Sequence, residues 1–298
     1  AATEEYNFST STVTAGAWAS GGNLNTARGY FSGFGTQTAA VANGGDLVPG
    51  KSAAVEHYDG SSWTNVTSMP TATSGQGASG TQTSGLVFGG YAATVTGNSF
   101  EYDGSSWTSG GSMGTARSID QGRSSAGTQT AALGFGGYAP GGARSETEEY
   151  DGTNWTAGGA LPAARNITGG SGTQTAGLVF GGMAPGIQSS SLSYDGSSWT
   201  AAPSLIYAVL TAGAAGTSTS SISMAGSTTV PLNTTTNSQV YNGTSWSTNP
   251  SLATARKYLS GVGTSSAALA VGGKPPASNA TEEFTGETTA ANVKTFTT

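Results

Sequence analysis

The side chains best suited to binding chemistry are four arginines that occupy the same place in a repeated pattern. Each follows a Met/Leu-x-Thr/Ala-Ala sequence; they are Arg28, Arg117, Arg165 and Arg256. A guanidinium donates paired hydrogen bonds to carboxylate, sulfate or phosphate groups. The functional interpretation is a shallow site for an anionic or sugar ligand, to which the loop residue Arg144 contributes. The structural alternative is that each arginine bonds backbone carbonyls of the adjacent repeat.

Three further side chains come directly after Gly-Gly pairs, namely Tyr91, Tyr138 and Met183. Tyrosine combines a flat apolar ring with a polar hydroxyl, so it can stack on a sugar ring. The same three side chains could instead cover the end of a packed unit. We treat them as candidate ligand-binding residues, together with the arginines.

Catalytic chemistry finds little support in the residue types. His57 is the only histidine and the chain has no cysteine, whereas a zinc or copper site normally requires several such ligands. The Glu pairs at 4–5, 148–149 and 282–283 fall in expected strands, where neighbouring side chains point to opposite faces. We therefore expect no catalytic residue, no metal and no cofactor.

Composition narrows the classes of partner. The 298-residue chain has 48 glycines, 9% charged residues and a formal net charge of −6. Its ten lysines and arginines are too few for a typical nucleic-acid surface, so we expect no nucleic-acid partner. No run approaches the roughly 18 apolar residues of a membrane-spanning helix, so we expect no membrane insertion.

A repeat must position the candidate residues. The tryptophans recur every 44 to 48 residues and are expected to be structural; they are Trp18, Trp63, Trp107, Trp155, Trp199 and Trp246. A Gly-Thr-Gln-Thr sequence keeps the same spacing, beginning at Gly35, Gly80, Gly127 and Gly172, with Gly-Thr-Ser variants at Gly216 and Gly263. Such a period is typical of four-stranded propeller blades.

Each repeat is expected to form four short strands, a to d. In the second repeat, strand a covers 73–78, strand b covers 83–88, strand c lies around 100–102 and strand d begins at Trp107. Asp-Gly at 103–104 supplies the turn between strands c and d, because it tolerates the positive φ of a hairpin. The a–b and c–d turns then share one face of the fold, and the b–c and d–a loops share the other.

The order of landmarks resembles the kelch repeat: a hydrophobic strand, a Gly-Gly pair, a Tyr 11 to 14 residues later and a Trp five residues after that Tyr. This resemblance covers nearly the whole chain and implies a β-propeller with a central channel. Six a–b pairs predict an all-β fold, a single six-bladed β-propeller of four-stranded antiparallel blades over residues 1–298. The Thr-Glu-Glu-Tyr-Asp-Gly wording at 147–152 also resembles kelch-like structural proteins of marine bacteriophages such as cyanophages.

The two chain ends, 1–18 and 281–298, occupy equivalent places in the repeat. Only one of them can complete the last blade. We expect the N-terminal segment from Tyr6 to Trp18 to close the ring because it retains the tryptophan, which leaves the C-terminal segment free. The alternative divides the blade, with strand c from 282–284 and strand d around Trp18.

The b–c loops differ from repeat to repeat; they cover 46–55, 91–97, 138–144, 183–190, 227–237 and 274–279. Loops that vary on a fixed scaffold commonly carry binding function. The phage resemblance implies a non-enzymatic virion-surface or tail-fibre protein, outside the cell. Its variable face would bind a host surface polysaccharide, another virion protein or copies of itself. An assembly module joined through its terminal strands and a polysaccharide-acting enzyme are the other two classes.

Overall fold

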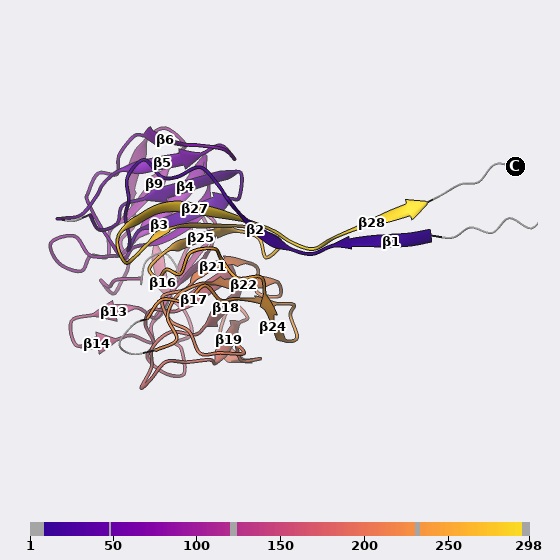
Figure 1. Cartoon of the computed structure of the whole chain (residues 1–298). Coiled ribbons are helices and arrows are strands. Elements are labelled where there is room, and N and C mark those ends of the chain that lie inside the picture. Colours follow the sequence, from indigo (N-terminus) through magenta and orange to yellow (C-terminus); the bar gives the residue numbers. More distant parts are fainter. Residues whose placement is uncertain (1–8, 48, 120–123, 230–232, 294–298) are drawn as a thin grey trace, which may run out of the picture.

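The chain folds as an all-β propeller of six blades, and Figure 1 shows the arrangement of its strands. The computed structural model describes residues 9–47, 49–119, 124–229 and 233–293. Each blade is a four-stranded antiparallel sheet whose strands a to d run from the central channel outward. The fold class expected from the repeat is confirmed.

The first three blades follow one another in the sequence. Blade 1 contains β3 (Ser32–Thr36), β4 (Ala39–Asn43), β5 (Val55–Tyr58) and β6 (Trp63–Val66). Blade 2 contains β7 (Gly77–Thr81), β8 (Ser84–Phe88), β9 (Ser99–Tyr102) and β10 (Trp107–Gly110). Blade 3 contains β11 (Ser125–Gly127), β12 (Ala132–Phe135), β15 (Thr147–Tyr150) and β16 (Trp155–Ala157), with the small hairpin β13 (Tyr138–Ala139) and β14 (Gly142–Ala143) in its b–c loop.

The other three blades complete the ring. Blade 4 contains β17 (Gly169–Thr173), β18 (Ala176–Phe180), β19 (Ser191–Tyr194) and β20 (Trp199–Ala202). Blade 5 contains β21 (Gly213–Gly216), β22 (Ser221–Met224), β23 (Ser238–Tyr241) and β24 (Trp246–Asn249). Blade 6 contains β25 (Ser260–Gly263), β26 (Ala267–Gly273), β27 (Ser278–Thr285) and, from the other end of the chain, β2 (Ala17–Ser20).

The inner strand of blade 2 starts later than expected. β7 runs from Gly77 to Thr81 rather than over 73–78, and its turn into β8 falls at 82–83. Gly75 has a φ of +66°, which lies outside the extended region of a strand. Ser74 forms an isolated bridge with Tyr91 instead. The residues just before β7 therefore belong to one face of the disc and not to the sheet.

Both ends of the chain complete blade 6. β2 pairs antiparallel with β27, so Trp18 lies opposite Phe284 and their ring centroids are 5.2 Å apart. Closure by the N-terminal segment is confirmed, but strand c comes from the C-terminal side, so the divided arrangement is the one present. The expectation that 6–18 supplies both outer strands is wrong, because β27 pairs directly with β26 and takes the place of strand c. Tyr6 itself lies outside the described residues.

Beyond blade 6, the two ends run together as a ribbon. β1 (Ser9–Thr14) pairs antiparallel with β28 (Thr288–Val293), and Figure 1 shows the pair extending away from the blades. The ribbon continues from the end of β27 and the start of β2, where every other blade has its c–d turn. It therefore leaves the disc on the face that carries the a–b and c–d turns, which we call the hairpin face.

Each tryptophan joins its blade to the preceding one. The indole Nε1 of Trp155 donates to Ser99 Oγ at 2.9 Å, and the other five tryptophans make bonds of the same kind. The ring of Trp155 also lies 4.6 Å from that of Phe88 in blade 2 and 5.1 Å from that of Tyr150 in its own blade. One tryptophan per blade is thus packed against the neighbouring sheet, which explains the spacing in the sequence.

The Gly-Thr-Gln-Thr turns join blades on the hairpin face. The Gln82 side-chain Nε2 donates to Ala40 O at 3.1 Å and to Tyr58 O at 2.9 Å, both in the preceding blade. The same pair of bonds is made by Gln37, Gln129 and Gln174. Four of the six blade interfaces are therefore joined by a glutamine, and the Gly-Thr-Ser turns of blades 5 and 6 have serine in its place.

Candidate functional site

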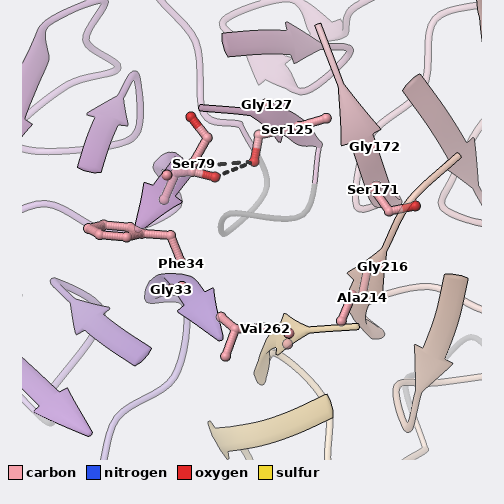
Figure 2. A pocket seen from close by; sticks show the side chains of 18 residues that line it. Gly33, Phe34, Ser79, Ser125, Gly127, Ser171, Gly172, Ala214, Gly216 and Val262 are labelled. Atoms are coloured by element: carbon pink, nitrogen blue, oxygen red, sulfur yellow. Dashed lines mark hydrogen bonds between the residues drawn. The ribbon is translucent and has the colours of Figure 1, made fainter. Parts of the chain in front are cut away.

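The central channel offers little chemistry. The same three positions of all six inner strands line a cavity of about 120 Å³ (Figure 2). Apart from Phe34 and Val262, these positions hold only glycine, alanine and serine. Ser125 Oγ donates to Ala78 O at 3.0 Å, so this hydroxyl already joins two inner strands. None of the side chains that line the cavity titrates.

At the other end of the channel, every blade presents an equivalent pair of residues. The residue after each Gly-Gly pair, or after Ala225-Gly226 in blade 5, forms an isolated β-bridge with the d–a connection. The pairs are Asp46–Gly29, Tyr91–Ser74, Tyr138–Ser118, Met183–Asn166, Ser227–Leu210 and Lys274–Lys257. We call the surface formed by these residues the mouth. Its backbone geometry is constant, whereas its side chains differ in size and charge.

Backbone hydrogen bonds hold the mouth together. In every blade the glycine that ends the Gly-Gly pair donates its N–H to the carbonyl at the arginine position of the next blade; the pairs are Gly45–Thr73, Gly90–Arg117, Gly137–Arg165, Gly182–Val209, Gly226–Arg256 and Gly273–Arg28. Gly90 has a φ of +101°, and a Cβ there would lie 2.9 Å from the backbone oxygen of Ser74, in the d–a connection of its own blade. Close approach of the two backbones therefore requires glycine, and it leaves the neighbouring side chains free to differ.

A depression of about 590 Å³ lies in the mouth. Its lining includes four tyrosines, which are Tyr30, Tyr91, Tyr138 and Tyr258. Tyr91 and Tyr138 are 45% and 47% exposed. The volume falls within the range of roughly 300–1,000 Å³ that is typical of small-molecule sites, and such sites are mostly apolar with a few polar groups.

Lysines lie over the tyrosine rings of the mouth. The distances from Nζ to the ring centroid are 4.5 Å for Lys51 and Tyr91, 4.6 Å for Lys274 and Tyr30, and 5.9 Å for Lys257 and Tyr258. The rings of Tyr30 and Tyr258 also stack, with centroids 4.1 Å apart. Asp46 lies beside them, with its Oδ2 3.8 Å from Lys274 Nζ. The mouth therefore combines ammonium groups with aromatic rings, and each ammonium is attracted to the face of the ring beneath it.

Left-handed backbone brings two of these tyrosines to the mouth. Tyr30 and Tyr258 have φ values of 57° and 56°, and Ile167 at the equivalent place in blade 4 has 57°. This conformation costs about 1–2 kcal/mol for a residue with a Cβ. The Tyr30 N–H donates to Tyr258 O at 3.4 Å, which joins blade 1 to blade 6. Backbone strain of this kind is found at functional sites, and all three residues line the depression.

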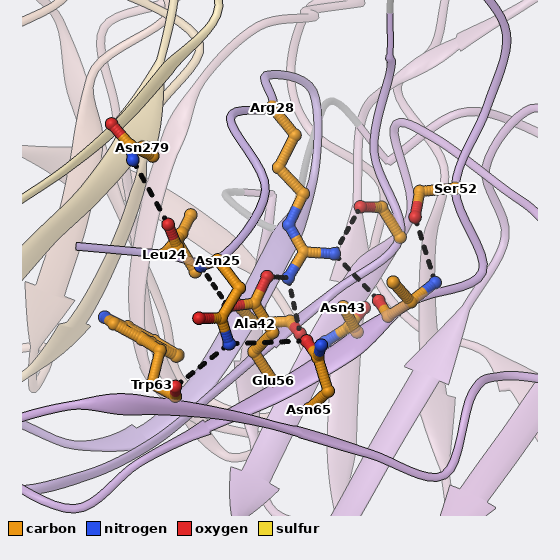
Figure 3. Close-up of polar contacts among 12 residues, drawn as sticks. Leu24, Asn25, Arg28, Ala42, Asn43, Ser52, Glu56, Trp63, Asn65 and Asn279 are labelled. Atoms are coloured by element: carbon orange, nitrogen blue, oxygen red, sulfur yellow. Dashed lines mark hydrogen bonds and ion pairs between the residues drawn. The ribbon is translucent and has the colours of Figure 1, made fainter.

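The four repeated arginines lie inside the blades, which corrects the expectation that they form a shallow site for an anionic or sugar ligand. Arg28 is 0% exposed; it donates to Ala54 O at 2.8 Å and pairs with Glu56 Oε1 at 2.9 Å (Figure 3). Equivalent buried ion pairs join Arg117 to Glu148 and Arg256 to Glu282. The structural alternative placed the accepting carbonyls in the adjacent blade. They belong instead to the same blade as the arginine.

Arg165 differs from the other three because blade 4 has Leu192 where they have a glutamate. Its guanidinium donates to Ser190 O at 3.1 Å and to Ser190 Oγ at 2.8 Å. Burial lowers the pKa of Arg165, and it lowers that of Arg28 to about 10 while Glu56 opposes the shift. A guanidinium with a pKa near 10 still carries its charge at neutral pH. The arginines therefore stabilise their own blades through buried hydrogen bonds and do not face solvent.

Two of the candidate residues from the sequence meet in the depression, namely Tyr91 and Tyr138. Arg144 lies beside it, where its Nη2 donates to Pro140 O at 3.2 Å and its Nη1 lies 3.9 Å from Glu146 Oε1. Met183 occupies the equivalent bridge position in blade 4 but does not line the depression. Arg123, in the insertion of the third repeat, lies outside the described residues.

Sequence reasoning missed Tyr30, Lys51, Tyr258 and Lys274. A signal existed for three of them. Tyr30 and Tyr258 each come two residues after a repeated arginine, and Lys274 follows a Gly-Gly pair as Tyr91 does. Lys51 has no such landmark, because it lies in a b–c loop whose length differs between repeats.

The described residues contain no cluster suited to a metal. No group of three or more His, Cys, Asp and Glu side chains among them could hold an ion, and no helix there is long and apolar enough to cross a membrane. His57 packs edge-on against Tyr102, with centroids 5.6 Å apart, and burial lowers its pKa. Glu101 accepts a hydrogen bond from the Tyr150 hydroxyl at 2.6 Å, and the Glu149–Tyr194 and Glu283–Tyr58 pairs are equivalent. These carboxylates therefore join blades.

No protein-family model and no curated protein matches the chain. The architecture that the structure shows is a six-bladed β-propeller of four-stranded antiparallel blades. The resemblance to kelch repeats depends on the Gly-Gly, Tyr and Trp landmarks of the sequence.

Proposed function

We propose that the protein is a non-enzymatic, kelch-like propeller that binds a host surface glycan through its mouth. The observation that carries this proposal is the tyrosine-lined depression of about 590 Å³, which lies on the face where side chains differ between blades. In this proposal the protein is displayed on a bacteriophage particle, outside the cell, as a tail-fibre, spike or decorating component. The phage assignment rests on the sequence resemblance alone.

Tyrosines held in place by backbone suit glycan binding. A sugar ring presents an apolar face of C–H groups, which packs on an aromatic ring while its hydroxyls bond polar neighbours. Tyr91 exchanges two backbone hydrogen bonds with Ser74, at 2.7 and 3.0 Å, and Tyr138 exchanges two with Ser118, at 2.9 and 2.8 Å. Because the rings are carried on fixed backbone, binding orders little of the protein and less affinity is lost to entropy.

The position of the ribbon also favours display. β1 and β28 leave the disc on the hairpin face, and the tyrosines lie on the opposite face. Figure 1 shows the ribbon on one side of the disc and the β13–β14 hairpin on the other. A propeller attached through the ribbon therefore directs its mouth away from the attachment point.

The proposal is tested with Tyr91→Ala combined with Tyr138→Ala. Binding of the purified chain to host cells and to a glycan array should fall at least tenfold, as expected for two exposed aromatic anchors. The matched control is Ile206→Ala, since Ile206 is 49% exposed and does not line the depression. Thermal unfolding of both variants should match the unsubstituted chain. Unchanged binding by the double variant, or no glycan bound by the unsubstituted chain, refutes the proposal.

A second candidate function is assembly through the ribbon, with a second copy of the chain as the partner. Within the described residues each ribbon strand pairs only with the other, and their sequences contain no charge and no proline to discourage further pairing. A lone two-stranded ribbon is marginally stable in water, so an added strand from another copy stabilises it. Val13, 55% exposed, lies on β1.

Sedimentation velocity tests this second candidate. Val13→Lys places a charge on the ribbon and should convert an oligomer to a monomer, whereas Ile206→Lys at the exposed site on the disc should leave the oligomer intact. A chain that sediments as a monomer before any substitution rules this candidate out.

A further inference from the structure

We infer that the glycan bound at the mouth is anionic and that Lys51 binds its carboxylate or sulfate group. This inference rests on the proposed function and specifies its substrate class. Lys51 and Tyr91 both line the depression, and the Lys51 Nζ lies 4.5 Å from the centroid of the Tyr91 ring. A sugar stacked on this tyrosine would therefore bring a charged substituent within reach of the ammonium.

Positive charge is concentrated at the mouth of a protein whose net charge is −6. All lysines of the described residues lie there: Lys51, Lys257 and Lys274. The hairpin face has the opposite character, because its c–d turns carry Asp59, Asp103, Asp151 and Asp195. Such a charge distribution attracts an anionic ligand toward one face and repels it from the other.

Lys51 is the mouth cation that is best placed to bind an anion. Lys274 lies 3.8 Å from Asp46, and Arg144 lies 3.9 Å from Glu146, so both already have a carboxylate nearby. Lys51 makes no ion pair with any carboxylate of the described residues. An ammonium with three donors and no carboxylate partner is suited to a carboxylate or sulfate oxygen.

The backbone also fixes Lys51 in position. Asp46 and Lys51 form an isolated β-bridge, and Leu47 N–H donates to Gly50 O at 2.8 Å. The backbone of Lys51 is therefore paired, and its ammonium lies over the Tyr91 ring. In this proposal Lys51 of blade 1 binds the anionic group, and the neighbouring Tyr91 of blade 2 packs on the sugar ring.

The test measures binding of the full chain to immobilised polygalacturonate, dextran sulfate and uncharged dextran. Lys51→Gln should weaken binding to the anionic polymers roughly tenfold, the equivalent of about 1.4 kcal/mol, and Lys51→Arg should retain it. Lys257→Gln is the matched control, because Lys257 lies at the mouth but does not line the depression. Raising NaCl from about 0.05 to about 0.5 M should weaken binding by the unsubstituted chain. The two anionic polymers distinguish carboxylate from sulfate as the preferred group.

The outcomes separate this inference from the proposed function. If uncharged dextran binds as well as the anionic polymers and Lys51→Gln changes nothing, the inference is wrong and glycan binding stands. If Lys51→Gln and Lys257→Gln weaken binding equally, diffuse charge accounts for it and the assignment to Lys51 fails. If no polysaccharide binds, the proposed function fails together with the inference.

Discussion

The two faces of the disc join the same six blades by different means. On the hairpin face, a side chain makes the connection, since Gln82 reaches two carbonyls of blade 1, and between the sheets Trp155 donates to Ser99 of blade 2. At the mouth, backbone makes them, since Gly90 N–H donates to Arg117 O and an equivalent bond joins all six interfaces. A bond made by a side chain requires the same residue in each repeat, whereas a bond made by backbone does not.

This difference explains which parts of the sequence repeat. The glutamines, the tryptophans and the Asp-Gly turns repeat because each of these side chains has an equivalent partner in the preceding blade or in its own blade. At the mouth the glycine before the bridge repeats in all six blades, whereas the position after it changes from Asp46 to Tyr91 to Lys274 without disturbing the bridge it forms. The mouth can therefore acquire binding side chains at little cost in stability.

The largest effect is expected from Trp155→Ala. The side chain is 9% exposed, packs on Phe88 and Tyr150 and donates to Ser99 Oγ. Truncation of a buried tryptophan should lower the free energy of unfolding by about 3–5 kcal/mol, measured by urea denaturation. Tyr138→Ala at the mouth is the comparison and should change it by no more than about 0.5 kcal/mol. Equal losses in the two variants would contradict the division between side chains that join the blades and side chains that only line the mouth.

Loss of one glutamine connection should have a smaller effect. Gln82→Ala removes two hydrogen bonds to Ala40 O and Tyr58 O, so we expect a loss of about 1–3 kcal/mol in the free energy of unfolding. Urea denaturation measures it. A loss below that of Tyr138→Ala would show that the glutamine does not join the blades.

Adding a glutamine where the repeat lacks one should stabilise the protein. Ser218 stands in blade 5 where Gln174 stands in blade 4. By equivalence, Ser218→Gln should reach the carbonyls of Gly177 and Tyr194 and raise the free energy of unfolding by about 0.5–1.5 kcal/mol. Ser218→Glu has the same length but its carboxylate cannot donate, so it should not stabilise. Equal effects of the two substitutions would exclude a hydrogen bond as the cause.

The tyrosine–glutamate pairs predict a pH dependence. Burial and the hydrogen bond to Glu101 raise the pKa of Tyr150 to about 12, and the pKa values of Tyr58 and Tyr194 are raised to about 12 in the same way. An unfolded tyrosine titrates near 10. The stability that these pairs contribute is therefore complete below about pH 10 and is lost as the pH rises toward about 12.

The measurement is the melting temperature between about pH 9 and about pH 12. Replacement of the three tyrosines by phenylalanine should lower it at neutral pH and make it fall less steeply over this window. A triple variant with the same alkaline slope as the unsubstituted chain would show that other groups govern alkaline unfolding.

The fold could be predicted because its signals are side chains with one repeated role. Trp155 and Gln82 occur at fixed spacing since each contacts the neighbouring blade, so counting them counts blades. The division of blade 6 was ambiguous because the residues around Trp18 and around Phe284 both carry repeat landmarks, and only the pairing of β2 with β27 decides between them. Strand β7 was misplaced because a left-handed Gly75 leaves no sign in the hydrophobic pattern.

The candidate site was only partly predictable. Tyr91 and Tyr138 were recognised because the Gly-Gly pair marks their place. The arginine pattern predicted the place of these residues in the repeat but not which way their side chains point. Arg28 points into the blade, where it pairs with Glu56 of strand c. That partner could have been found, since the repeats of Arg28, Arg117 and Arg256 all have glutamate two residues before the strand-c aromatic residue. Lys51 could not, because the b–c loop that carries it differs in sequence and in length from one repeat to the next.

The backbone connection at the mouth is tested by a substitution of Thr211 that should stabilise the protein. Thr211 has a φ of 60° and a buried Oγ1 that lacks a hydrogen-bond partner among the described residues, while its backbone bonds Ile167 O and Tyr258 N. Thr211→Gly removes the left-handed strain of about 1–2 kcal/mol and the unpaired hydroxyl. It forfeits one buried methyl, at about 0.8 kcal/mol, and adds unfolded-chain entropy of about 0.5–1 kcal/mol.

Thr211→Gly should therefore raise the free energy of unfolding by about 1 kcal/mol, which is the balance of these contributions. Blade 2 already has Gly75 at the equivalent place, with a φ of +66° and the same backbone bonds to its neighbours. Thr211→Ala is the control, because it keeps the Cβ and its strain and should gain less. If glycine destabilises the protein by more than about 1 kcal/mol, the threonine side chain itself joins the blades here, and the two faces do not differ in the way their sequences suggest.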